Sequence, residues 1–283
     1  ANQLAIRMLV APGEELIAET NSHIVRAELG AAAVFSGITT RTFPAKNGLL
    51  KAADALEIAR PDSGPYLVST TAIAVENTHN FGGGTIQPIS EIAALRKGAN
   101  ELGLALHLDG ARIWNAHVAS GVSLAEYGKY FDTISVCFSK GLGAPIGSMA
   151  LSTSERIASA RVWRKRYGGG MRQVGILAAA ADYAITHHMS DLSHDHRRAK
   201  ALATAIAQVD SSLIDPASVA TNIVGLNLKV LGITAAELAQ RTKDSGLLIG
   251  ALGPHFARLV THRDFDDAQC DQAIEILRKT LVA

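Results

Sequence analysis

The chain has 283 residues, of which 48% are hydrophobic and 19% charged, a balance typical of a folded globular protein with one large domain or two unequal ones. Lys plus Arg number 27 and Asp plus Glu number 26, so no surplus of positive charge is available for a nucleic-acid backbone or an anionic membrane. Two cysteines exclude a disulfide scaffold and a four-cysteine zinc site, and they fit a reducing compartment.

The first half of the chain alternates helical and extended segments. Helices are expected at residues 1–10, 23–29, 49–59, 89–102 and 124–130. Extended segments are expected at residues 15–19, 33–35, 41–43, 66–75, 104–108, 133–138 and 146–151. This alternation predicts an α/β fold, with a mainly parallel sheet sandwiched by helices.

The second half turns helical and then alternates again. Helices are expected at residues 174–187, 191–209, 235–245 and 266–281, with strands at 223–228, 247–249 and 257–260. We therefore predict a large domain over residues 1–190 and a smaller C-terminal α+β domain over residues 191–283. The apolar runs are too short to cross a bilayer and no secretion signal opens the chain, so we expect a cytoplasmic location.

Polar residues that follow the predicted strands are the first candidates for a site, because ligands of open α/β sheets bind beyond the carboxyl ends of the strands. The candidates are Asp109, Lys140, His79 and His23. Taken singly, each has a simpler explanation. The aspartate can cap a helix, the lysine can be solvated in a turn, and each histidine can be a hydrogen-bonded structural group.

Asp109 and Lys140 together are more informative than either alone, because they end successive strands of the predicted sheet. Pyridoxal phosphate chemistry needs a carboxylate facing the pyridine nitrogen and a lysine that forms an imine with the aldehyde. A lysine that is partly desolvated at a strand end can lose its proton and form that imine.

Four segments, HLDGAR, SKGLGAPIGS, ENTHN with the following GGG, and WRKRYGGGMRQ, together resemble the low-specificity L-threonine aldolases. The resemblance runs from Ala1 to about Thr261. It implies a pyridoxal-phosphate enzyme of fold type I that cleaves L-threonine or L-allo-threonine to glycine and an aldehyde. It implies a homodimer or homotetramer with shared active sites. We expect no metal, and the charge balance and the short apolar runs predict no nucleic-acid or membrane partner.

The resemblance also implies roles for particular residues. Lys140 carries the cofactor, Asp109 pairs with the pyridine nitrogen and His23 stacks on the ring. Arg112 and Arg258 hold the substrate carboxylate, and His79, near the substrate hydroxyl, is the first candidate for the base. Lys165, on the substrate side, and Arg172, on the cofactor side, match basic residues that approach the site from a neighbouring subunit.

Two alternatives stay open at this point. A fold type I enzyme with the same cofactor could break a different bond, as a β-eliminating lyase or an aminotransferase does. The family also has an N-terminal loop that binds the cofactor phosphate and precedes the match to Ala1, so we expect an N-terminally incomplete chain. An inactive, truncated homologue is therefore the second alternative.

Overall fold

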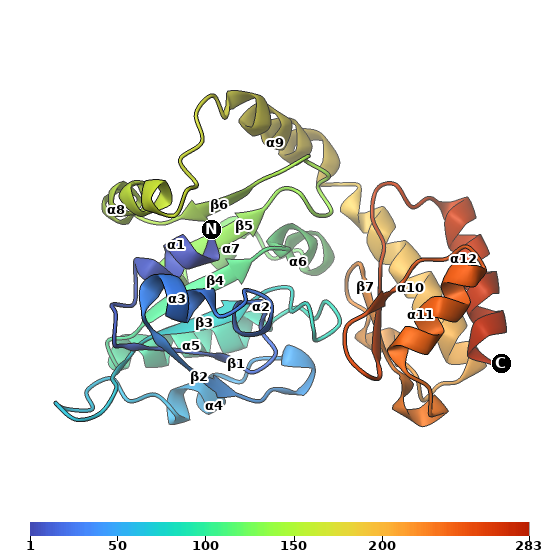
Figure 1. Ribbon diagram of the computed structural model, residues 1–283, viewed down its shortest axis with the longest axis horizontal. Helices are drawn as coiled ribbons and strands as arrows, with labels where there is room; N and C mark the ends of the chain where they lie inside the picture. Colours follow the sequence, from blue (N-terminus) through green and yellow to red (C-terminus); the bar gives the residue numbers. More distant parts are fainter. Residues whose placement is uncertain (283) are drawn as a thin grey trace.

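The computed structural model describes residues 1–282 and contains a larger body on a six-stranded sheet and a smaller body on a three-stranded sheet (Figure 1). In the large sheet the strand order is β2-β1-β3-β4-β5-β6, and all neighbours are parallel except β5 and β6. The strands are β1 (Glu15–Glu19), β2 (Thr39–Phe43), β3 (Thr70–Glu76), β4 (Ala105–Gly110), β5 (Thr133–Cys137) and β6 (Ser148–Leu151). The predicted mainly parallel sheet is confirmed.

Helices cover both faces of this sheet, because successive strand residues point to opposite faces. On β3, Ala72 and Ala74 pack in a core with α1 (Asn2–Arg7) and α3 (Ala31–Ser36), whereas Ile73 and Val75 pack against α4 and α5. The remaining helices of this body are α2 (His23–Arg26), α4 (Ala52–Glu57), α5 (Ile89–Glu101), α6 (Ile113–Ser120), α7 (Leu124–Gly128), α8 (Ser154–Arg166) and α9 (Gly175–His188).

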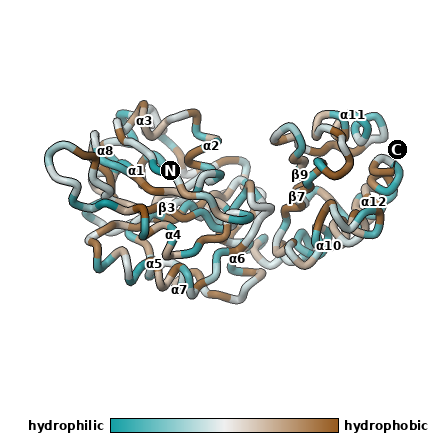
Figure 2. The backbone as a smooth tube through the Cα atoms, turned by 90° about the horizontal axis from the view of Figure 1, so that it is seen from below, coloured by the Kyte–Doolittle hydropathy of each residue, from teal (hydrophilic) through white to brown (hydrophobic). Residues whose placement is uncertain are grey.

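The smaller body has an antiparallel sheet in the order β7-β9-β8, and Figure 2 shows from below that its helices group apart from the larger body. Its elements are α10 (Leu192–Val209), β7 (Ile223–Asn227), α11 (Ala235–Asp244), β8 (Gly250–Ala251), β9 (Phe256–Val260) and α12 (Asp267–Leu281). On β9, Ala257 and Leu259 pack into the core of this body, so the residue between them, Arg258, points to the opposite face.

The helix α10 belongs to both bodies. Its first residue, Leu192, packs in the core that contains Leu108 and Val136 of the large sheet. From Ala199 onward its apolar face packs in the core of the smaller body. The division of the chain at residue 190 stays a prediction.

Two local predictions were wrong, and one helix was not predicted. Residues 33–35 lie in the helix α3, which follows Gly30 and ends at Gly37, whose left-handed backbone angles are typical of a helix C-terminus. The helix α6 had been missed, because its mixed sequence has little amphipathic pattern. The strand expected at residues 247–249 lies slightly later, at Gly250–Ala251. No helix within residues 1–282 is long and apolar enough to span a membrane.

Candidate active site

The parallel strands bring a row of polar side chains to one edge of the sheet. Glu76 of β3 is the register partner of Asp109 on β4, and Asp109 is the partner of Ser135 on β5. Glu76 lies on the same face as Ala74, two residues earlier, and this is the face that α1 covers. The strand-end row therefore lies beneath the N-terminal helix.

The carboxylate of Asp109 is 2% exposed and is fixed by two N–H donors. Asn2 Nδ2 donates to its Oδ2 at 2.9 Å, and the backbone N–H of Ala111 donates to its Oδ1 at 3.2 Å. Within residues 1–282, Asp109 forms no salt bridge. A buried carboxylate without a cation is costly, so this position favours a ligand that brings a positive charge.

The amide of Asn2 has a defined orientation, because its Nδ2 lies between two carboxylates, at 2.8 Å from Glu28 Oε1 and 2.9 Å from Asp109 Oδ2. Its Oδ1 therefore faces His107 Nε2, at 3.2 Å. An amide oxygen only accepts, so His107 carries its proton on Nε2, and its Nδ1 accepts from the hydroxyl of Thr133 at 3.0 Å. Burial lowers the pKa of His107 to about 4, which keeps the ring neutral.

His79 is 1% exposed and both of its ring nitrogens are engaged. The backbone N–H of Gly82 donates to Nδ1 at 3.0 Å, so Nε2 carries the proton and donates to Glu19 Oε2 at 2.9 Å. Burial alone would lower the pKa of His79, but the Glu19 hydrogen bond and the charges of Glu76 and Glu19 together raise it. Its role as base stays a prediction, because a substrate hydroxyl would first have to replace one of these contacts.

Glu76 connects the two predicted histidines. Its Oε2 accepts from the backbone N–H of His23 at 2.6 Å, and its Oε1 accepts from the backbone N–H of Asn80 at 2.8 Å. Burial raises the pKa of Glu76, the charge of Asp109 raises it further, and His79 opposes both. The His23 side chain is 35% exposed at the start of α2, and its stacking on a cofactor ring stays a prediction.

The two arginines expected to hold a carboxylate converge on one oxygen from different bodies. Arg112 Nη1 lies 3.2 Å from Asn80 Oδ1, and Arg258 Nη1 lies 2.6 Å from the same atom. The Nε atoms of both arginines are buried without a hydrogen-bond partner. Burial lowers the pKa of each guanidinium, and the charge of Arg258 adds to the effect on Arg112. Among the described residues neither arginine forms a salt bridge, so the pair lacks an anion.

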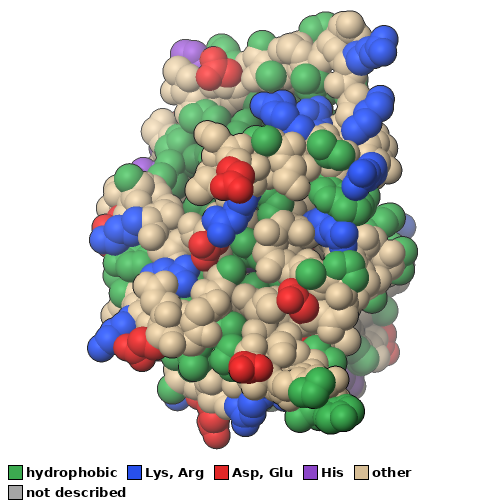
Figure 3. All heavy atoms as spheres, turned by 90° about the vertical axis from the view of Figure 1, so that its left-hand side faces the viewer, with side chains coloured by type: hydrophobic (Ala, Val, Ile, Leu, Met, Phe, Trp, Pro, Cys, Tyr) green, Lys and Arg blue, Asp and Glu red, His purple; other side chains and the backbone are tan. Residues whose placement is uncertain are grey.

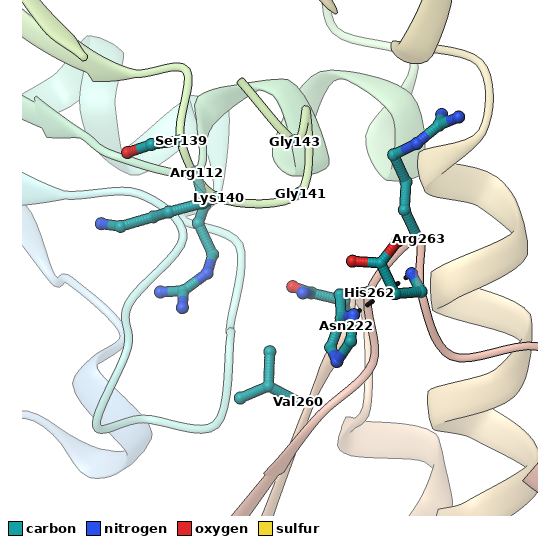
Figure 4. A pocket seen from close by; sticks show the side chains of 10 residues that line it. Arg112, Ser139, Lys140, Gly141, Gly143, Asn222, Val260, His262 and Arg263 are labelled. Atoms are coloured by element: carbon teal, nitrogen blue, oxygen red, sulfur yellow. Dashed lines mark hydrogen bonds between the residues drawn. The ribbon is translucent and has the colours of Figure 1, made fainter. Parts of the chain in front are cut away.

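A cavity of about 390 Å³ opens beside this pair, between the loop after β5 and the end of β9 (Figure 4). Lys140 and Arg112 line it from the larger body, whereas Asn222, His262 and Arg263 line it from the smaller body. The volume is within the range of small-molecule sites.

The predicted residues Lys165 and Arg172 are exposed and lie around the loop between α8 and α9, outside this cavity. Their approach to an active site stays a prediction.

The strand-end rule that selected Asp109 also applies to Glu19 and Glu76, which sequence reasoning had missed. Asn80 had been passed over as a neighbour of His79. Within residues 1–282, no group of three His, Cys, Asp or Glu side chains could hold a metal ion.

Comparison with known proteins places this arrangement in a family. Residues 1–229 match the family described as Beta-eliminating lyase, and the chain belongs to that family. A low-specificity L-threonine aldolase 1 of Arabidopsis thaliana is 32% identical over 95% of the chain and 76% of its own length. A low specificity L-threonine aldolase of Escherichia coli is 36% identical over 95% of the chain and 78% of its own length.

The fold also matches solved structures. A threonine aldolase of Leishmania major superposes with a TM-score of 0.80, at 21% identity, over 99% of the chain and 81% of that structure. At this identity the match shows the fold alone, and it agrees with the predicted fold type I architecture.

The contact between Gly48 and His79 gives a testable prediction. Gly48 has φ +67°, and an added Cβ would lie 2.3 Å from His79 Cγ. We expect Gly48→Ala to lower the free energy of unfolding by about 2–4 kcal/mol, because backbone strain and overpacking add. Gly103→Ala is the matched control, since Gly103 has φ +66° and open space around its Cβ position, so it tests the backbone strain alone. Equal losses in urea denaturation would contradict the packing argument.

The neutral His107 predicts a pH dependence of stability. Its folded pKa of about 4 lies below the ordinary 6.5, so its contribution is complete above pH 6.5 and is lost as the pH falls toward 4. Between pH 7.5 and pH 5, we expect the unfolding free energy of the wild type to fall by about 2 kcal/mol more than that of His107→Asn. Urea denaturation at several pH values measures this difference. The exposed His194, replaced by Asn, is the control and should show no such difference.

Proposed function

We propose that this β-eliminating lyase family member cleaves L-threonine and L-allo-threonine to glycine and acetaldehyde, with pyridoxal phosphate as its cofactor. One observation carries the proposal: two half-buried arginines, with buried Nε atoms and no salt bridge within residues 1–282, converge on Asn80 beside a cavity that Lys140 and Arg112 line. Two relatives named low-specificity L-threonine aldolase, at 32% and 36% identity, support the reaction.

The residues fit the proposed cofactor. The uncompensated carboxylate of Asp109 suits a protonated pyridine nitrogen, and Lys140 supplies the amine that takes up the aldehyde. When bound, pyridoxal phosphate accepts the electron pair that remains when the bond between Cα and Cβ of the substrate breaks. Asn2 orients the Asp109 carboxylate through its amide hydrogen bond.

The arginines orient the substrate. A carboxylate bound by Arg112 and Arg258 forms charge-assisted hydrogen bonds, which are stronger in a buried site than in water. Holding this end of the amino acid sets the bond to be broken relative to the cofactor ring. Removal of the hydroxyl proton is assigned to His79 as first candidate, with Glu19 stabilising the protonated ring.

The products of threonine test the reaction. The purified protein, supplied with pyridoxal phosphate, should release acetaldehyde and glycine in equal amounts from L-threonine, as measured by a coupled reductase assay and amino-acid chromatography. Release of 2-oxobutanoate and ammonia without glycine would instead support the alternative of another lyase in this fold. Transfer of the amino group to a 2-oxo acid would support an aminotransferase.

Lys140 gives the second test of the function. Reduction of the protein with borohydride, followed by digestion, should place a pyridoxyl group on the peptide that contains Lys140. Lys140→Ala should remove the visible absorption band and lower the cleavage rate by several orders of magnitude. Lys140→Arg should not restore either, because a guanidinium keeps its proton. Lys97→Ala, at an exposed helix position, is the control and should behave as the wild type.

We also propose that the protein works as a homo-oligomer. The helix α9 buries only Ala184, and Ile176 and Tyr183 on it are 82% and 59% exposed. In the upper part of Figure 3, where α8 and α9 lie, hydrophobic side chains are exposed between lysines and arginines. A second copy that covers this apolar face would bring the neighbouring Lys165 and Arg172 close to its own site, as the resemblance implies. The expected cytoplasmic location stays a prediction.

Charge on α9 tests the oligomer. Ile176→Asp should shift the protein from oligomer to monomer in light scattering and lower its aldolase activity, because burying a carboxylate in an interface is costly. Leu248→Asp changes a residue of similar exposure, 78%, on the smaller body, and it should leave the mass unchanged. A wild type that is monomeric and fully active would contradict the proposal.

A further inference from the structure

The side-chain oxygen of Asn80 lies between Arg112 and Arg258, and the proposed mechanism gives it no role. Two guanidinium groups brought to the same atom repel each other, and the repulsion is strong where burial excludes water. Asn80 Oδ1 accepts from both, at 3.2 Å and 2.6 Å, and within residues 1–282 no carboxylate pairs with either arginine. The oxygen partly offsets the repulsion without cancelling the charges.

Asn80 is held firmly by its own backbone. Its N–H donates to Glu76 Oε1 at 2.8 Å, and its carbonyl accepts from the N–H of Gly83 at 3.2 Å. The residue is 9% exposed. The carboxylate of Glu76, at the end of β3, therefore fixes the backbone of Asn80 and with it the direction of the Asn80 side chain.

The turn that contains Asn80 also joins the two bodies. Thr221 Oγ1 in the smaller body donates to the carbonyl of Gly84 at 2.8 Å. The contact between Asn80 and Arg258 spans the same boundary, since Arg258 lies on β9. Through these contacts the turn sets the distance between Arg112 in the larger body and Arg258 in the smaller body.

We propose that Asn80 is a positioning residue, which holds Arg112 and Arg258 together as a ready site for one carboxylate and whose neutrality is essential to that site. An aspartate of the same shape would form the ion pairs that the substrate should form, and it would compete with the substrate. An alanine would remove the acceptor and let the guanidinium groups separate. The proposal rests on the proposed carboxylate-binding role of the two arginines.

The test compares Asn80→Asp and Asn80→Ala in the full-length holoenzyme and in the cofactor-free protein. Asn80→Asp should raise the KM for L-threonine about tenfold or more, with a smaller change in kcat, because it occupies the arginines before the substrate arrives. In the cofactor-free protein it should raise the melting temperature, since two unpaired cations gain a partner. Asn80→Ala should raise KM and lower the melting temperature.

Glycine binding supplies a readout that does not depend on turnover. Added glycine should raise the melting temperature of the wild-type holoenzyme, because its carboxylate fills the arginine site, and this rise should be lost in Asn80→Asp. Asn100→Asp, at an exposed position on α5, is the matched control for the change of charge and should match the wild type in every assay.

The outcomes separate the two proposals. If the wild type cleaves threonine but Asn80→Asp keeps its KM, its melting temperature and its response to glycine, the inference about Asn80 is wrong and the function stands. If the wild type does not cleave threonine but the melting temperatures change as expected, the function is wrong and the positioning role of Asn80 stands.

Discussion

Buried charge without an ionic partner is the constraint on which this site depends. Within residues 1–282, Asp109 accepts hydrogen bonds from two N–H donors and forms no salt bridge, and Arg112 and Arg258 meet at a neutral amide. Each arrangement costs stability in the free chain, because a charge removed from water needs an opposite charge nearby. A cation brought to Asp109 and a carboxylate brought to the two arginines would each remove one of these costs.

The fold supports this arrangement with elementary strand geometry. Parallel strands place Glu76 and Asp109 in register at one edge, and the two-residue period turns both toward the helix that carries Asn2. The same period on β9 sends Ala257 and Leu259 inward and leaves Arg258 to face the larger body. One body therefore supplies Lys140 and Asp109, and the other supplies Arg258, one of the two arginines proposed to hold the substrate carboxylate.

Much of this could be predicted from the sequence, because strand-end residues and apolar periodicity are local properties. Asp109, Lys140 and the parallel sheet follow from such patterns, and Glu19 and Glu76 could have been found by the same rule. The role of Asn80 could not, since its partner Arg258 is 178 residues away and belongs to another sheet. Nor could the sequence show that both ring nitrogens of His79 are hydrogen-bonded, because one bond comes from a backbone N–H and the other goes to a carboxylate 60 residues away.

The helix α10 has a mechanical consequence, since Leu192 is anchored in one core and the residues from Ala199 onward are anchored in the other. A helix that is packed into both cores opposes sliding of the smaller body along the large sheet. Arg258 stands on β9 of the smaller body, whereas Arg112, Lys140 and Asp109 belong to the body of the large sheet. The residues proposed to hold the cofactor therefore lie on one body, and the two arginines proposed to hold the substrate carboxylate are divided between two, so a displacement of the smaller body would act on the substrate site and not on the cofactor site.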